Sequence, residues 1–265
     1  MKKALSGIYL ALFMIFLYAP IMVLVVLSFN NSRSRVTWGG FTFDWYIKLF
    51  SNNQIKETLV TTIMLALFSA LISTVIGVAA ALGIHAMKRR GFRIMMVFTN
   101  IPILNADIVT GIALMLVFAR FIPFGFGSLL IAHITFNIPY VILSVMPKIK
   151  QMNISMYEAA RDLGAGPVYG FFRVVFPQLI SGIVSGFFMA FTMSMDDFVI
   201  TYFTKGAGVN TLSTMIYGEI RKGIKPEMYA LSTLIFIVIF VILLLANYLP
   251  ERISKKSMAK KNIDF

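Results

Sequence analysis

Cysteine is absent from this chain of 265 residues, and charged side chains are scarce. Without cysteine the chain can form no disulfide, no thiolate metal site and no thiol redox motif. Charged residues make up 13% of the sequence, whereas a soluble domain carries about a quarter. Hydrophobic residues make up 58%. This composition argues against a soluble enzyme and predicts an all-α, polytopic membrane protein.

A phosphate-binding loop is absent as well, because no stretch has the pattern Gly-x-x-x-x-Gly-Lys followed by Ser or Thr. The chain therefore cannot hydrolyse ATP with the usual P-loop, and we expect no catalytic residue, no metal and no cofactor of its own. No stretch has the composition of a soluble ligand-binding domain. An energy source and a cargo receptor would have to come from other chains.

Six apolar stretches are long enough to cross a bilayer as helices. They cover approximately residues 8–29, 59–87, 94–119, 121–146, 178–203 and 228–249. We interpret residues 1–265 as one transmembrane domain. The first stretch follows Lys2 and Lys3 but is long and lacks a small-residue cleavage site, so we expect an uncleaved span.

The distribution of lysine and arginine predicts the orientation. With the N-terminus in the cytoplasm, fifteen of the 24 basic residues fall in inside segments, and the remainder are spread over longer outside loops. The positive-inside rule then places both termini in the cytoplasm. The same rule accounts for the net charge of +13 without nucleic acid, because the basic residues flank the predicted spans.

The predicted cytoplasmic loop 150–177 has an unusual local pattern. Residues 157–163 favour a short helix, and Gly164 stands where a helix ends in a left-handed cap. Gly166 and Pro167 then enforce a turn. From the residues alone, this elbow is either a docking surface for another protein or an ordinary connection.

The elbow resembles the EAA loop of ABC importer permeases. Glu158-Ala159-Ala160 is followed after three residues by Gly164 and after nine more by Val174-x-Phe176-Pro177, with Val and Phe replacing the family's Ile and Leu. The resemblance implies the type I ABC importer permease fold, with this loop as the coupling helix for a cytoplasmic ATPase. The coupling residues it implies are Tyr157, Glu158, Ala159, Ala160, Asp162, Leu163, Gly164 and Pro177.

Stretches elsewhere, including Tyr18-Ala19-Pro20-Ile21 and Ser194-Met195-Asp196-Asp197, are similar to permease subunits of spermidine/putrescine transporters. This resemblance implies a polyamine cargo and a place in a bacterial cytoplasmic (inner) membrane. It implies a sister permease subunit, two copies of an ATPase that binds ATP and magnesium, and an extracytoplasmic polyamine-binding protein. The sequence does not separate spermidine from putrescine.

Three aspartates lie within predicted spans, where an ionised carboxylate needs a partner or water. At 1.5 Å per residue, Asp107 and Asp196 lie roughly 20 Å and 27 Å along their spans, in the outer half of the membrane. Asp196 and Asp197 point about 100° apart, so we expect one to line the path and the other to cap a broken helix or contact a neighbouring subunit. We favour Asp107 and Asp197 for the cargo path.

The environment of these aspartates leaves several alternatives open. Tyr140 and Tyr202 are candidate cation–π partners for a polyamine, or packing residues. The aspartates could instead form structural contacts, for example with Arg120. We expect His133 to be an interhelical hydrogen-bonding residue rather than a ligand.

Three other functions compete with polyamine import. The chain could be a permease for another small solute of the same superfamily. An ion-coupled carrier would use Asp107 and Asp197 as proton sites but usually shows internal repeats, which we do not find. An intramembrane aspartyl protease would need Gly-x-Gly before one aspartate, and neither Asp107 nor Asp196 has it.

Overall fold

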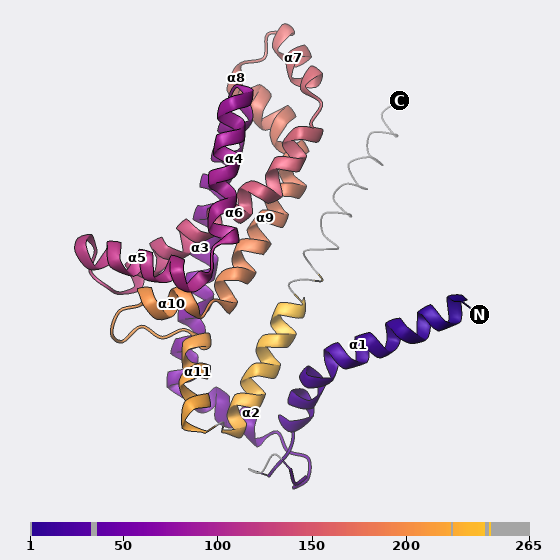
Figure 1. The fold of residues 1–265 in the computed structure, drawn as a ribbon, viewed down its shortest axis with the longest axis vertical. Coiled ribbons are helices and arrows are strands. Elements are labelled where there is room, and N and C mark those ends of the chain that lie inside the picture. Colours follow the sequence, from indigo (N-terminus) through magenta and orange to yellow (C-terminus); the bar gives the residue numbers. More distant parts are fainter. Residues whose placement is uncertain (1, 33–35, 224, 242–243, 245–265) are drawn as a thin grey trace. The chain divides into compact units, whose positions relative to one another are not determined.

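The computed structural model describes residues 2–32, 36–223, 225–241 and 244, and nearly all of this part of the chain is helical (Figure 1). Within these ranges the one β-type contact is an isolated bridge between Asn30 and Phe41. The predicted all-α fold is confirmed. It is the expected outcome for an apolar chain, because helices satisfy their own backbone hydrogen bonds inside a membrane.

In chain order, the helices are α1 (Lys2–Leu27), α2 (Asp44–Ser51), α3 (Asn53–Ala86), α4 (Arg89–Leu104), α5 (Asp107–Phe121), α6 (Phe126–Gln151), α7 (Ile154–Asp162), α8 (Pro167–Gly170), the π-helical turn η1 (Phe171–Val175), α9 (Phe176–Asp196), α10 (Val199–Thr204), α11 (Leu212–Lys222) and an unlabelled helix, Pro226–Val241.

Four of the described helical stretches are long and apolar enough to cross a membrane: α1, α3, α6 and the continuous stretch Pro167–Asp196. The bent pair α4–α5 makes a fifth if it counts as one span. The predicted sixth span, 228–249, begins in the shorter apolar helix Pro226–Val241 and continues outside the described residues. The described helices are therefore compatible with six spans.

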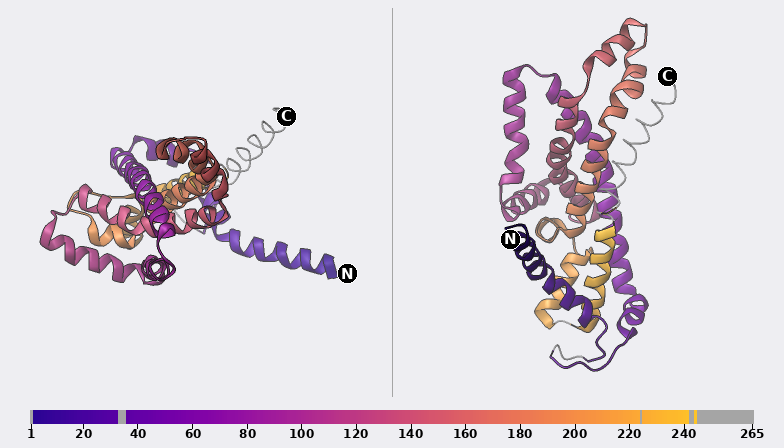
Figure 2. Two further views of the ribbon diagram at one scale, coloured as in Figure 1. Left: turned by 90° about the horizontal axis from the view of Figure 1, so that it is seen from above. Right: turned by 90° about the vertical axis from the view of Figure 1, so that its right-hand side faces the viewer.

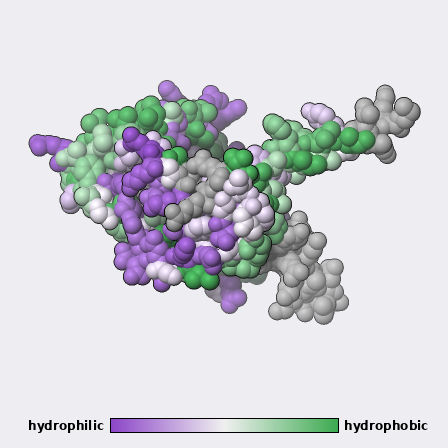
Figure 3. All heavy atoms as spheres, turned by 90° about the horizontal axis from the view of Figure 1, so that it is seen from below, coloured by the Kyte–Doolittle hydropathy of each residue, from purple (hydrophilic) through white to green (hydrophobic). Residues whose placement is uncertain are grey.

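By its internal contacts the chain divides into two compact units, the first formed by Met1–Thr58 with Met215–Val241. In this unit α1 exposes its apolar side chains, for example Phe16 at 82%, as its green surface in Figure 3 shows. Trp45 of α2 is buried and donates its indole N–H to the Asn30 carbonyl at 2.8 Å. An apolar helix so exposed requires lipid or another protein around it.

The second unit is formed by Leu59–Thr214 with Ile242–Phe265. Its core is the packing of α6 against α9, which run side by side in Figures 1 and 2. Two glycines allow other helices to approach α6 closely at Val141: an added Cβ would lie 2.6 Å from Val141 at Gly77 of α3 and 3.3 Å at Gly186 of α9. Small residues at helix contacts are typical of membrane bundles. The prediction that the whole chain is one domain stays a prediction.

The predicted third span, 94–119, is not a straight helix. α4 ends at Leu104, α5 begins at Asp107, and the two meet at 102°. Pro102 in the last turn of α4 weakens the helix there, and Asn105 has an extended backbone. The depth predicted for Asp107 assumed one continuous helix from residue 94. That assumption was wrong, because the helix breaks and bends before Asp107.

The predicted fifth span, 178–203, is also broken. Its α9 segment covers Phe176–Asp196 and continues the helical stretch that begins at Pro167; after a break the helix resumes as the short α10 at Val199. α10 packs against α5 and α6. The two breaks therefore lie in one region of the second unit.

Candidate functional site

A cavity of about 290 Å³ lies at these two helix breaks. It is lined by Asp107, Phe136, Thr192, Met193, Asp196, Asp197, Phe198 and Val199. The structure thus brings together the three aspartates that the sequence placed in two separate spans. It does so with the ends of helices rather than with their middles.

Asp107 and Asp196 are the open carboxylates of this cavity. Asp107 is the first residue of α5, Asp196 is the last residue of α9, and both side chains are exposed. At the start of α5 the carboxylate of Asp107 also lies favourably at the positive end of the helix dipole. Both groups are available to a cation that enters the cavity.

Asp197, in contrast, is engaged by the protein itself. Its carboxylate accepts hydrogen bonds from the Thr201 N–H at 2.7 Å, the Thr201 hydroxyl at 2.8 Å and the Ile200 N–H at 3.2 Å. Its side chain is only 8% exposed. Asp197 therefore caps the start of α10. The expectation that one of the adjacent pair caps a broken helix is confirmed for Asp197, and its role in the cargo path stays a prediction because it also lines the cavity.

A layer of buried polar side chains lies behind the cavity. His133 of α6 shares a hydrogen bond of 3.0 Å with the Thr201 hydroxyl, and its Nε2 is 3.6 Å from the Asp197 carboxylate. Asn137 donates to Ser194 at 2.7 Å, and Ser194 shares a hydrogen bond of 2.9 Å with Ser69. The prediction of an interhelical role for His133 is confirmed. The sequence reasoning assigned no hydrogen-bonding role to Ser69, Ser194 or Thr201, because isolated hydroxyls in apolar stretches give little signal.

Aromatic rings border the carboxylates. Tyr140 lies close enough to Asp107 to interact with it electrostatically, and its ring meets that of Phe136 edge to face at 5.7 Å. Tyr202 contacts Phe198 at 5.5 Å but is not in the cavity lining. Phe136 and Phe198, which the sequence reasoning did not select, are the aromatic residues of the lining itself.

The elbow is the second feature of functional interest, and Figure 1 shows α7 at the tip of the helices that it joins. Asn153 caps the start of α7 by accepting the Ser155 N–H at 3.1 Å. At its other end Gly164 has φ +85°, and the N–H groups of Gly164 and Ala165 bond back into the last turn of α7 at 2.9 and 3.0 Å. These bonds form a Schellman motif. The predicted left-handed cap at Gly164 is confirmed.

The elbow leaves an apolar surface uncovered. No residue of α7 is buried, and Leu163 is 89% exposed. Tyr157 is the anchor, because its ring packs against Gly170 and the helical core; a Cβ at Gly170 would lie 2.9 Å from that ring. Pro177 stands in the first turn of α9. The elbow is therefore a fixed protrusion with an exposed apolar tip.

A family model for binding-protein-dependent transport system inner membrane components matches residues 73–256, which include the elbow and every cavity residue. The chain belongs to this family. Among relatives of this permease, the spermidine/putrescine transport system permease protein PotC of Escherichia coli (strain K12) is 34% identical over 251 residues, or 94% of this chain and 95% of PotC. The putrescine transport system permease protein PotI of the same strain is 33% identical, covering 91% of this chain and 89% of PotI.

Solved structures support the fold of the permease. A chain of a bacterial ABC transporter that imports the acidic polysaccharide alginate has a TM-score of 0.71 at 17% identity, with 95% of both chains covered. A chain of the MetNI methionine ABC transporter has a TM-score of 0.61 at 16% identity, covering 76% of this chain and 99% of that one. The fold is that of an ABC importer permease.

Proposed function

We propose that this permease is the subunit of an ATP-driven, binding-protein-dependent importer that carries polyamines, spermidine or putrescine, across the bacterial cytoplasmic membrane. The observation that carries the proposal is the convergence of Asp107, Asp196 and Asp197 on one cavity. The printed names of PotC and PotI support the same cargo class. The chain would supply the path but no catalytic group.

The cavity suits a flexible polycation for electrostatic reasons. Carboxylates are costly inside a membrane unless a cation or water compensates them. Asp107 and Asp196 are exposed to the cavity, and charge-assisted hydrogen bonds to ammonium groups are the strong ones. The rings of Phe136 and Phe198 add faces to which a cation is attracted. An anionic sugar would meet repulsion in the same space.

The exposed surface of the elbow is evidence for a partner protein that docks on it in the cytoplasm. Exposed apolar residues on a rigid protrusion, here Leu163, Met156 and Ile154, are typical of protein interaction sites. We propose that one ATPase copy receives α7, with Glu158, Ala159, Ala160 and Asp162 on the docking helix. A second ATPase copy would meet the sister permease subunit, and an extracytoplasmic binding protein would deliver the polyamine.

The proposed orientation places the elbow and both termini in the cytoplasm, following the positive-inside rule. The basic residues beyond Pro250 that contribute to this prediction lie outside the described part of the chain. A cysteine introduced at Ser155, on the exposed side of α7, would test it. We expect it to react with a membrane-impermeant maleimide in inside-out vesicles and to be protected in right-side-out ones.

The decisive experiment is reconstitution of this permease in liposomes with its sister permease, ATPase and binding protein. We expect binding protein loaded with spermidine or putrescine to stimulate ATP hydrolysis and labelled polyamine to accumulate. Stimulation by a neutral or anionic solute alone would refute the polyamine assignment and favour another cargo. Uptake that follows a proton gradient without ATP would favour an ion-coupled carrier.

A further inference from the structure

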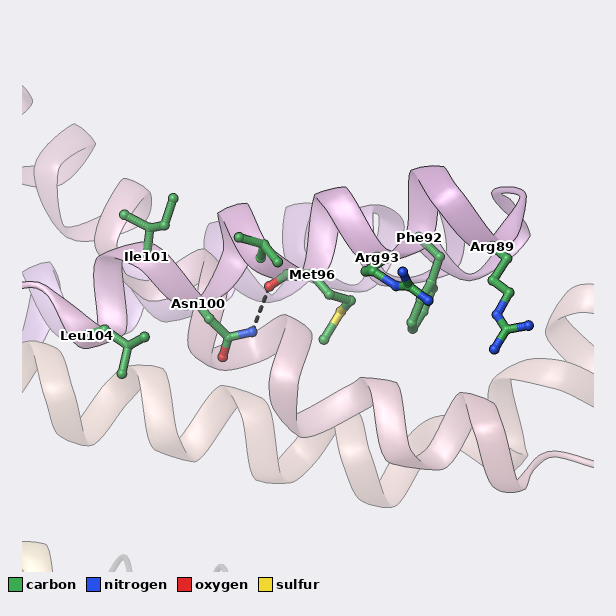
Figure 4. A pocket seen from close by; sticks show the side chains of 8 residues that line it. Arg89, Phe92, Arg93, Met96, Asn100, Ile101 and Leu104 are labelled. Carbon is green, nitrogen blue, oxygen red and sulfur yellow. Dashed lines mark hydrogen bonds between the residues drawn. The ribbon is translucent and has the colours of Figure 1, made fainter.

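A groove along α4 combines a basic end with an apolar body. It encloses about 510 Å³, and its lining includes Arg89, Phe92, Arg93, Met96, Asn100 and Leu104. Figure 4 shows Arg89, Phe92, Met96, Asn100 and Leu104 pointing to the same side of α4. Their spacing of three to four residues places them on one helix face. Neither the polyamine cavity nor the elbow uses this face.

Three cations gather at the start of the groove. Arg89 and Arg93 lie in the first two turns of α4 and are exposed. Lys150 comes from α6, with its Nζ 5.1 Å from the centre of the Phe92 ring. The salt bridges found among the described residues involve other side chains, and α4 contains no acidic residue. The positive charge at this end thus has no acidic partner in the described part of the chain.

The apolar part of the groove has the length of one lipid leaflet. From Phe92 to Leu104 it extends over thirteen residues of α4, whose twelve steps of 1.5 Å span about 18 Å. One half of a typical hydrocarbon core is about 15 Å thick. Met96, Ile101 and Leu104 supply apolar side chains along this distance. The groove therefore changes from basic to apolar on the scale at which a phospholipid changes from head group to acyl chain.

We propose that this groove binds one anionic phospholipid of the cytoplasmic leaflet. Its phosphate head group contacts Arg89, Arg93 and Lys150, and an acyl chain lies along Met96 toward Leu104. Basic pockets between transmembrane helices on the cytoplasmic side are suited to anionic head groups. The leaflet assignment rests on the proposed membrane orientation, with the elbow in the cytoplasm. A helix of the sister permease is the competing occupant, but it would have to bring acidic side chains to the three cations.

The test measures phosphatidylglycerol bound to the complete transporter by native mass spectrometry, after delipidation and titration with this lipid or with phosphatidylcholine. We expect wild type to bind phosphatidylglycerol in preference. Arg89→Gln with Arg93→Gln should weaken binding about fivefold for each charge removed, or about 25-fold together. Met96→Trp, which keeps the charges and fills the groove, should also reduce binding.

The matched control is Lys88→Gln with Arg90→Gln, which removes the same number of charges from the same segment but none from the groove lining. We expect it to bind phosphatidylglycerol as wild type does. Equal binding by wild type and the Arg89/Arg93 double variant, or no preference for the anionic lipid, would overturn the proposal. Val97 also lines the groove. Protection of a Val97→Cys variant from a lipid-soluble maleimide on assembly with the sister permease would likewise overturn the proposal.

The two proposals can fail separately. Polyamine uptake without specific phosphatidylglycerol binding would refute the lipid site and leave the proposed function intact. Specific binding in a transporter that moves no polyamine would refute the proposed cargo and support the lipid site.

Discussion

Replacement of Gly164 tests whether the shape of the elbow couples the ATPase to transport. Gly164 has φ +85°, where an L-residue costs about 1–2 kcal/mol more than glycine. Proline cannot adopt this φ, and it also removes the N–H that bonds to the Arg161 carbonyl at 2.9 Å, which is worth about 1 kcal/mol. The sum of about 2–3 kcal/mol is a lower limit for proline, so the capped elbow is disfavoured at least 30- to 150-fold.

The effect of Gly164→Pro should remain local, because no residue of α7 is buried. We therefore expect normal membrane insertion and assembly, but at least a tenfold loss of polyamine taken up per ATP hydrolysed. Asn tolerates the left-handed conformation better than Ala does, so loss of coupling should increase in the order Asn, Ala, Pro. The assay is simultaneous measurement of uptake and phosphate release in liposomes.

Gly166→Ala is the matched control. Gly166 has φ −63° with no atom near its added Cβ, so alanine fits there and coupling should be that of wild type. Wild-type coupling in Gly164→Pro would refute the role of the elbow's shape. An equal loss in Gly166→Ala would show that any change in this loop is harmful and that the left-handed cap has no special role.

Three further predictions concern the cavity and the core. Asp107→Asn and Asp196→Asn should each raise the KM for polyamine uptake about 10- to 100-fold, which is the change in affinity expected from the loss of one hydrogen bond to a charged group. Unchanged KM values would show that neither residue contacts cargo. Asp197→Ala should lower the stability of the purified permease by about 1 kcal/mol and Asp197→Asn by less, because Asn still caps α10; thermal unfolding distinguishes them, and equal losses would contradict the capping role. Gly77→Ala should destabilise the packing of α3 on α6 by about 1–3 kcal/mol, because its Cβ would lie 2.6 Å from Val141. Gly83→Ala, with open space around its Cβ, is the control and should not. Thermal unfolding measures both, and similar stabilities of the two variants would refute the close contact.

The elbow was predictable from the sequence because the interactions that shape it join residues close together in the chain. The helix formers before Gly164 and the Gly166-Pro167 turn act within one short segment, and the structure confirms the cap that they predict. The presence of aspartates in the apolar spans was also visible. Neither inference needed knowledge of distant contacts.

The arrangement of the cavity was not predictable in the same way. Ser69 and Ser194 are 125 residues apart and meet only because α3 and α9 pack together. Pro102 and Asn105 indicated an interruption but not its angle of 102°, and the packing of α10 on α5 joins segments far apart in the sequence. For the same reason the sequence could not show that Asp197 turns to α10 and leaves Asp196 open.

The unbroken course from Pro167 to Asp196 has a mechanical consequence. These 30 residues form one helical rod, which is about 45 Å long at 1.5 Å per residue. Tyr157 fixes the elbow to one end of the rod through Gly170, and the carboxylate of Asp196 is carried by the other end. A displacement of α7 can therefore reach Asp196 along one helical stretch, without a series of side-chain contacts between separate elements. If the ATPase docks on α7 as we propose, the rod would transmit a displacement of α7 to the carboxylate of Asp196.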